Sequence, residues 1–166
     1  MTRTLKRSLA ILGLIAVIVP SAVQANVVNG TAAKVPIFQK RGANEIADVG
    51  PLAPSLQGKP AVVRIHADWC PACKATQATI DDLNKAYAGK INFVQFNVTN
   101  AKTAAASKAE AQKLGLEKFY DATKAATSTV AVIDPKDGKV YATFYNDGNI
   151  ADYESAINRA LKAEHL

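Results

Sequence analysis

Sulfur is scarce in this sequence. Its 166 residues contain two cysteines and a single methionine, Met1. Other soft metal ligands are rare as well, because the two histidines, His66 and His165, stand far apart in the chain. The ligand-rich composition that is typical of copper or zinc carriers is therefore missing.

The two cysteines, Cys70 and Cys73, lie three positions apart. A disulfide across so short a segment closes a very small loop and removes little conformational entropy from the unfolded chain. A purely structural crosslink is therefore a weak explanation for this pair.

Apolar runs are too short to cross a bilayer. The longest, residues 9–19, is interrupted by Gly13 and is about half as long as the roughly twenty residues that a membrane-spanning helix requires. Three basic residues precede it, and a stretch of small residues after it ends at Ala25. This order is typical of a secretory signal peptide, so we expect residues 1–25 to be cleaved near Ala25. An uncleaved membrane anchor is the alternative.

Clustered charge is also missing. The formal net charge of +6 includes the three basic residues of the signal peptide, and the lysines of the remaining chain are dispersed. Because arginines and aromatic residues form no cluster, nucleic-acid binding is not expected. We expect an exported protein, periplasmic or otherwise, in a compartment that permits disulfides, with no transmembrane segment in the mature chain.

The cysteines stand between a predicted strand and a predicted helix. Residues 61–67 are largely apolar, and residues 71–87 repeat apolar side chains at helical spacing. We expect Cys70 at the helix N-terminus, where unpaired backbone N–H groups stabilise a thiolate. Cys73 is then one turn further on the same face. Pro71 fits the first turn, where its missing N–H costs nothing.

The other predicted elements extend in both directions. Residues 26–59 are rich in glycine, proline and other turn formers, so we expect an N-terminal extension there and a single domain over residues 60–166. The strand at 91–98 is expected to run parallel to the first, because a helix joins them. The remaining predicted elements are a short strand at 35–38, a short helix at 43–48, a helix at 101–114 that Gly115 ends, a connection of uncertain form at 117–127, strands at 130–134 and 139–145, and a helix at 152–162.

This order of elements, with Trp-Cys-x-x-Cys between the first of these main strands and its helix, resembles the thioredoxin family over about residues 60–161. Residues 67–74 and 97–99 look most like the C-terminal periplasmic domain of the transmembrane disulfide reductase DsbD. Residues 56–60 look more like TlpA-type exported thioredoxins. The resemblance implies an α/β thioredoxin fold, with a central mixed sheet flanked by helices, and no cofactor.

The resemblance also implies thiol–disulfide exchange with protein disulfides and dithiols. Cys70 would be the attacking thiol and Cys73 the resolving thiol, so that the pair alternates between a dithiol and a disulfide. Pro71 and Ala72 lack the histidine of the most oxidising exported members, which favours a reductant or electron relay. A membrane-bound redox partner is a candidate. Trp69 has two interpretations, as a half-buried support for the loop or as a contact surface beside Cys70.

Two polar residues of the first main strand are unexpected. Arg64 aligns with the buried carboxylate that thioredoxins use as a proton acceptor, and arginine cannot take up that proton. If Arg64 lies behind the dithiol, its charge would favour thiolates, and we expect it to lower the pKa of Cys70. Alternatively, its guanidinium reaches solvent or pairs with a carboxylate. His66, on the same face, is either the replacement proton acceptor or only a hydrogen-bonded neighbour.

A further departure lies just before the strand at 130–134. The family places a cis-proline in a loop that faces the dithiol, whereas this chain has Thr127 and Ser128 there. We expect a trans bond between them, because a cis bond before a non-proline residue costs about 3–4 kcal/mol, and a loop that still faces Cys70. The missing proline opens an alternative function, in which the two thiolates, with or without His66, bind Cu(I) or Zn(II).

Overall fold

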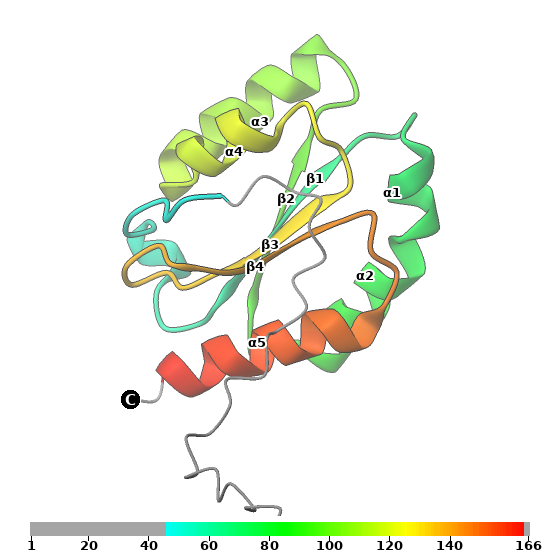
Figure 1. Ribbon diagram of the computed structural model, residues 1–166. Coiled ribbons are helices and arrows are strands. Elements are labelled where there is room, and N and C mark those ends of the chain that lie inside the picture. Colours follow the sequence, from blue (N-terminus) through cyan, green and yellow to red (C-terminus); the bar gives the residue numbers. More distant parts are fainter. Residues whose placement is uncertain (1–45, 165–166) are drawn as a thin grey trace, which may run out of the picture. The chain divides into compact units, whose positions relative to one another are not determined.

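A mixed sheet is the central layer of the described chain, which comprises residues 46–164 of a computed structural model. The strand order is β2-β1-β3-β4 (Figure 1). The strands are β1 (Ala61–His66), β2 (Asn92–Asn97), β3 (Thr129–Ile133) and β4 (Val140–Tyr145). β1 pairs in parallel with β2 and antiparallel with β3, and β3 pairs antiparallel with β4. The predicted mixed sheet and the parallel pairing of its first two strands are therefore confirmed.

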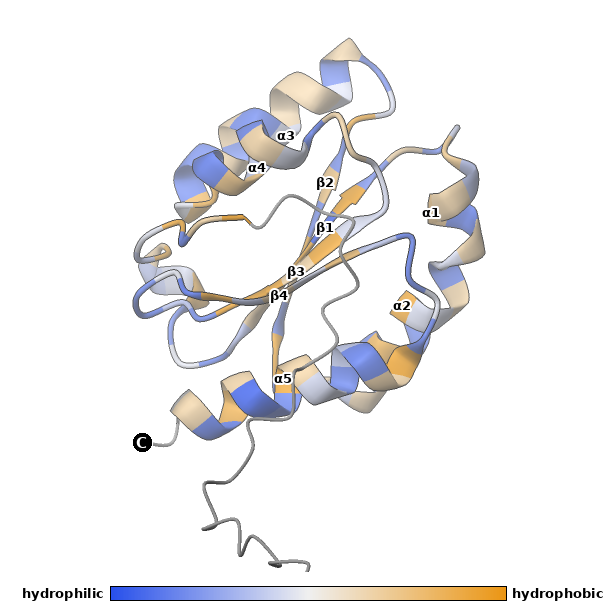
Figure 2. Cartoon of the chain, viewed as in Figure 1, coloured by the Kyte–Doolittle hydropathy of each residue, from blue (hydrophilic) through white to orange (hydrophobic). Residues whose placement is uncertain are grey.

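Helices cover both faces of this sheet. They are the 3-10 turn η1 (Pro54–Leu56), α1 (Pro71–Ala75), α2 (Gln77–Ala86), α3 (Ala101–Leu114), α4 (Glu117–Thr123) and α5 (Ile150–Glu164). Figure 1 shows α3 and α4 on one side of the sheet and α2 and α5 on the other. Figure 2 shows hydrophobic residues along β1 and β3, and hydrophilic residues on the outer surfaces of the helices. The α/β class predicted from the sequence is confirmed.

Each face of the sheet has its own hydrophobic core. Val63 and Ile65 of β1 belong to the core on the side of α3 and α4, together with Phe119. Val62, which points the opposite way because side chains alternate along a strand, packs in the other core with Ile157 of α5. β1 is therefore buried on both faces, which explains its nearly continuous apolar sequence.

The helix α3 has the bounds that the sequence predicted. Asn100 begins it with a capping box, in which its side chain accepts from the Thr103 N–H and the Thr103 hydroxyl accepts from the Asn100 N–H. Gly115 ends it at a φ of 74°, a left-handed conformation that glycine adopts without strain. The connection of uncertain form at 117–127 contains a further helix, α4.

The helix predicted at 71–87 is in fact divided into α1 and α2 by Thr76, whose φ is −89° and ψ −2°. The hydroxyl of Thr76 donates to the carbonyl oxygen of Ala72, and Arg64 donates to the carbonyl oxygen of Cys73. Side chains therefore bond two carbonyl groups of α1 at the point where this helix ends. Apolar periodicity alone could not reveal this break.

The segment before η1 lies along the β3–β4 hairpin and forms hydrogen bonds with it. The Asp48 carboxylate accepts a hydrogen bond from the Val140 N–H, and the Val49 N–H donates to the Gly138 carbonyl. The prediction of a helix at 43–48 is therefore wrong for its described part, in which hydrogen bonds to the hairpin replace helical ones.

Two glycines meet where this segment crosses the hairpin turn. Gly138 has a φ of +76°, and a Cβ atom there would overlap the backbone of Gly50. Nearby, the Leu52 N–H donates to the Pro135 carbonyl at 2.9 Å, and the Leu52 side chain lies in the core on the α3–α4 side. The segment is thus built into the hairpin end of the sheet.

The other N-terminal predictions, a signal peptide at 1–25 and a strand at 35–38, lie outside the described residues, as does His165. Within residues 46–164, the helices all lack the length and apolar character that a bilayer crossing requires.

Candidate active site

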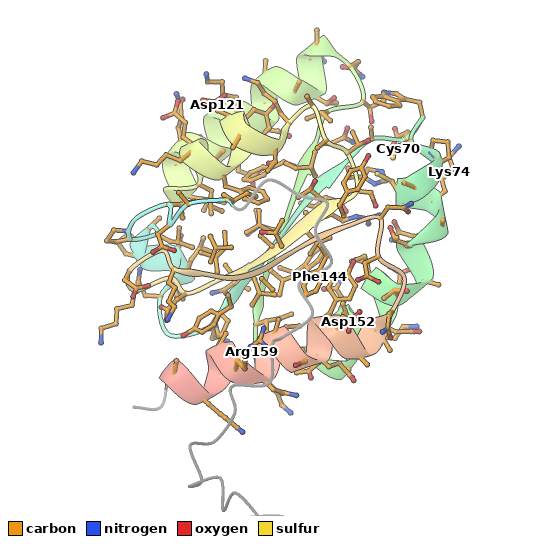
Figure 3. The ribbon with its side chains drawn as sticks, in the orientation of Figure 1. Cys70, Lys74, Asp121, Phe144, Asp152 and Arg159 are labelled. Carbon is orange, nitrogen blue, oxygen red and sulfur yellow. The ribbon has the colours of Figure 1, made fainter. Side chains whose placement is uncertain are left out.

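Cys70 is the N-cap residue of α1, just after β1 (Figure 3). Its backbone is extended, with a φ of −79° and a ψ of 114°, and Pro71 follows in the first turn. The Cys70 Sγ atom accepts a hydrogen bond from the Cys73 N–H at 3.1 Å, as an N-cap side chain does. The structure thus places these three residues on the helix as the sequence predicted.

The loop between α4 and β3 lies against Cys70. The Thr127 hydroxyl donates to the Cys70 Sγ at 3.1 Å, and the Ser128 N–H donates to the Ile65 carbonyl of β1 at 2.9 Å. The expectation that this loop faces Cys70 is therefore confirmed. The Cys70 sulfur atom thus accepts hydrogen bonds from the Cys73 backbone and from the Thr127 hydroxyl.

These hydrogen bonds favour the thiolate of Cys70. Burial raises the pKa of the Cys70 thiol, but hydrogen bonds from the side chains of Cys73 and Thr127 lower it. The N–H groups of Cys73 and Ala72 lower it further, so that the net effect is a pKa below that of an ordinary thiol. A thiolate at this position is a competent nucleophile.

The pKa of the Cys73 thiol is shifted in the opposite direction. Its side chain is fully buried, and its Sγ atom lies 3.9 Å from the Ile65 carbonyl oxygen. Burial and the hydrogen bond to Cys70 raise the pKa of the Cys73 thiol, and they outweigh the lowering effects of the Ala67 backbone and the Arg64 charge. Both cysteines are free thiols in this structure. Cys70 therefore ionises in preference to Cys73.

Arg64 is fully buried beside Cys73. Its Nη2 atom donates to the Cys73 carbonyl at 2.8 Å, and its Nη1 atom donates to the side-chain oxygens of Gln77 at 2.8 Å and Gln95 at 3.3 Å. The interpretation that Arg64 reaches solvent or pairs with a carboxylate is therefore wrong within the described residues. Its Nη1 and Nη2 atoms instead donate to neutral oxygens on α1, α2 and β2, while its buried Nε atom has no hydrogen-bond partner among the described residues.

The charge of Arg64 acts on Cys73. Burial has the larger and opposite effect on Cys73, but Arg64 lowers the pKa of that thiol. For Cys70, burial raises the pKa, and the hydrogen bonds to its sulfur atom are the leading causes of its net lowering. The expected effect of Arg64 on the attacking thiol stays a prediction.

His66 lies at the end of β1, and its Nε2 atom is 3.1 Å from the Asp68 Oδ1 atom. Its Nδ1 atom is buried without a hydrogen-bond partner among the described residues. The hydrogen bonds of Cys70 and Cys73 go to other groups within this part of the chain. The geometry favours the interpretation of His66 as a hydrogen-bonded neighbour over that of a proton acceptor.

Trp69 precedes the dithiol, and its side chain is 60% exposed. Its indole N–H donates to the Thr99 carbonyl at 2.9 Å, and the Asp68 N–H donates to the Thr99 hydroxyl at the same distance. The ring therefore fixes the loop and presents an apolar surface next to Cys70. Ala72, between the cysteines, is half-buried and packs against them.

Sequence reasoning missed the role of Thr76 and the conformation of Ser128. Ser128 is buried at a φ of +68°, which is uncommon for a residue with a side chain. Its hydroxyl lies 3.3 Å from the Thr76 hydroxyl. In the sequence, Thr76, Gln77 and Gln95 look like ordinary polar residues of amphipathic elements. Only the unexpected charge of Arg64 indicated that buried polar partners must exist.

Metal ligands do not gather around the dithiol. Residues 46–164 contain no group of three or more histidine, cysteine, aspartate or glutamate side chains that could hold a metal ion. His66 instead directs its Nε2 atom towards Asp68. For the alternative of a Cu(I) or Zn(II) site, the described chain supplies the two thiolates without further ligands.

A dithiol whose first sulfur caps a helix, directly after a central strand of a mixed sheet, is the arrangement of thiol–disulfide oxidoreductases. The family model for thioredoxin matches residues 53–134, which include β1, the dithiol and β3. Residues 53–134 therefore belong to the thioredoxin family.

The chain is also similar to individual proteins. It is 43% identical over 53 residues to a thiol:disulfide interchange protein TxlA homolog of Synechocystis, a match that covers 31% of this chain and 29% of that protein. It is 42% identical over 45 residues to the chloroplastic thioredoxin-like protein HCF164 of Arabidopsis thaliana, covering 27% of this chain and 17% of that protein. The matched segment thus spans less than a third of either relative.

One solved structure in the comparison is a thiol:disulfide interchange protein of the thioredoxin family from Chlorobium tepidum TLS. It is 22% identical to this chain, with a TM-score of 0.48, over 64% of this chain and 83% of that one.

Proposed function

We propose that this protein is an exported thiol–disulfide oxidoreductase that acts on protein disulfides through Cys70 and Cys73. One observation carries the proposal. The Cys70 Sγ atom is the N-cap of α1 and accepts hydrogen bonds from the Cys73 N–H and the Thr127 hydroxyl, both at 3.1 Å. These donors stabilise a thiolate at the entrance to a helix, where it can attack a partner.

The exchange needs only the two sulfur atoms of the dithiol. The Cys70 thiolate attacks one sulfur of a partner disulfide, and the other partner sulfur leaves as a thiolate. Cys73 then attacks the Cys70 Sγ atom, so that the bond to the partner breaks and a Cys70–Cys73 disulfide forms. The partner gains two electrons, and this protein loses them.

We further propose that the protein works as a reductant or electron relay outside the cytoplasm. The support is the dipeptide Pro71-Ala72, which lacks a histidine, and the leader-like residues 1–25 that precede the domain. In this scheme residues 26–59 lead into a thioredoxin-like domain over 60–166. A membrane-bound redox protein is the candidate partner that keeps the dithiol reduced.

The test uses purified protein that lacks residues 1–25 and a disulfide-bonded model protein. The reduced protein should cleave the substrate disulfide, and Cys73→Ser should accumulate a mixed disulfide through Cys70 that mass spectrometry can locate. Cys70→Ser should form no such adduct. Loss of export when residues 1–25 are deleted, measured by cell fractionation, tests the compartment. Equal adduct formation through either cysteine would contradict the assignment of the attacking thiol.

A further inference from the structure

We propose that Arg64 is a positioning residue for the second step of exchange. It holds a fixed positive charge beside Cys73, at the position where the family resemblance implies a proton acceptor. The proposal rests on the proposed function and assigns to Arg64 the activation of the resolving thiol. Cys73 then attacks as a thiolate without a side-chain base in contact with it.

The hydrogen bonds of Arg64 fix its guanidinium next to Cys73. The Arg64 side chain is fully buried, and all of its hydrogen bonds go to neutral oxygens. The shortest of them join its guanidinium to the Cys73 carbonyl and to the Gln77 side chain, both at 2.8 Å. Because α1 ends after Ala75, its last turn can present the Cys73 carbonyl to this side chain. The positive charge of Arg64 therefore lies next to Cys73, the residue that carries the resolving thiol.

The buried charge of Arg64 has no counter-ion among the described residues. Neutral oxygens accept hydrogen bonds from the two terminal nitrogens of the Arg64 guanidinium, whereas its buried Nε atom has no hydrogen-bond partner among the described residues. These oxygens do not neutralise the charge, and a buried unpaired charge is costly. Within the described residues, Arg64 forms no ion pair. The attraction between this charge and an anion that formed nearby would therefore be stronger than at the same distance in water.

Among the described groups with a clear pKa shift, Arg64 acts on Cys73 and on Tyr153 of α5. Burial and the nearby Asp147 raise the pKa of the Tyr153 phenol, and Arg64 only partly opposes them, so that Tyr153 stays neutral. For Cys73, the ionisable groups that act on it are Cys70 and Arg64. Cys73 is thus the group that can supply the anion.

The role of Arg64 differs between the two steps. In the free dithiol, the Cys73 thiol donates to the Cys70 thiolate, and both contacts with Cys70 raise the pKa of Cys73. In the mixed disulfide, Cys70 carries no charge, so that the repulsion ends and Arg64 remains. Cys73 then loses its proton to water and attacks the Cys70 Sγ atom. The electron pair of the broken bond leaves with the partner sulfur, which takes up a proton.

The decisive experiment titrates Cys73 in a Cys70→Ala background, which mimics the neutral Cys70 of the mixed disulfide. The ultraviolet absorbance of the thiolate is followed against pH with Arg64 present and in Arg64→Met and Arg64→Lys. We expect a higher titration midpoint in Arg64→Met and a smaller rise in Arg64→Lys, which keeps the charge. Arg159→Met is the matched control, because Arg159 lies on α5, apart from Cys70 in Figure 3, and should leave the midpoint unchanged.

A kinetic measurement extends the test to proteins that retain Cys70. Release of a preformed mixed disulfide should be about three- to tenfold slower in Arg64→Met at neutral pH and should recover as the pH rises, because the rate follows the thiolate fraction. A purely structural role would lower the rate at all pH values without moving the profile. Should Arg64→Met fail to fold, Arg64→Gln and Arg64→Lys give the same comparison of neutral and charged side chains.

The two proposals fail in different ways. The titration requires no partner, so an unchanged Cys73 midpoint in folded neutral variants would overturn the role of Arg64 even if the protein reduces disulfides. Conversely, a protein that does not exchange disulfides would contradict the proposed function, whatever the midpoint.

Discussion

The hydroxyl groups of Ser128 and Thr76 lie 3.3 Å apart in the interior. This contact joins the loop that follows α4 to the break between α1 and α2. The Thr76 hydroxyl also lies 3.5 Å from Arg64 Nη2, which donates to the Cys73 carbonyl. A buried chain of polar groups therefore links the loop that faces the dithiol to the helix that carries it.

Ser128→Pro should destabilise the protein by about 3 kcal/mol or more. Proline is restricted to a φ near −65°, whereas Ser128 has a φ of +68°, and proline would also remove the N–H that donates to the Ile65 carbonyl. Ser128→Gly accepts the positive φ and keeps that N–H, so it should cost about 1 kcal/mol or less. Urea unfolding compares the two. Equal stability of the two variants would show that the backbone of this loop adapts.

Thr127→Val should make the reduced Cys70 about three- to tenfold slower to alkylate at neutral pH, because the hydroxyl that stabilises its thiolate is lost. The rate should recover at high pH, where the thiol ionises without that help. Thr79→Val is the control, since the Thr79 hydroxyl donates to the Gly148 carbonyl instead. The same loss of reactivity in both variants would point to a general disturbance of the fold.

As the pH rises, the free energy of unfolding of the reduced protein should increase relative to that of its Cys70→Ser variant. Burial raises the pKa of Cys70, but the hydrogen bonds to its sulfur lower it more, so the folded thiol ionises first. Between the two pKa values the unfolded chain binds more protons than the folded one, so stability rises with pH. The gain is complete above the unfolded-state pKa of about 8.5 and is lost as the pH falls through the folded pKa. Urea unfolding under reducing conditions at several pH values measures it. A stability difference that does not vary with pH would mean that the pKa of Cys70 is not lowered.

Gly138→Ala should destabilise the protein by about 2 kcal/mol or more, because the new Cβ overlaps the Gly50 backbone at a φ of +76°. Gly58→Ala separates the two causes. Gly58 has a φ of +79° with open space around it, so its variant should lose only about 1 kcal/mol from backbone strain. Thermal unfolding of both variants gives the comparison. Equal losses would mean that the segment before η1 moves aside from the hairpin.

Local signals predicted the parts of this fold that depend on neighbouring residues in the chain. The helix α3 follows from an alanine-rich stretch that ends at a glycine, and the position of Cys70 follows from a strand that precedes a helix containing an early proline. Such features are set by short-range geometry, so periodicity and capping rules suffice.

The details around Arg64 depend on contacts between distant parts of the chain. Gln95 comes from β2, Thr76 from the helix break, and Ser128 from a loop more than fifty positions further on. No pattern within one element specifies that these neutral groups meet a buried guanidinium. The burial of Arg64, the break at Thr76 and the positive φ of Ser128 were therefore not predictable from the sequence.

The burial of Arg64 has a thermodynamic consequence for the redox couple as a whole. A disulfide carries no charge, whereas the dithiol can ionise to a thiolate that the guanidinium attracts. Arg64 consequently stabilises the dithiol relative to the disulfide, which raises the standard reduction potential above that of the same domain with a neutral residue at this position. The residue that helps Cys73 to attack thus makes the disulfide easier to reduce and the dithiol a weaker reductant, a balance that suits a relay which must accept electrons as well as donate them.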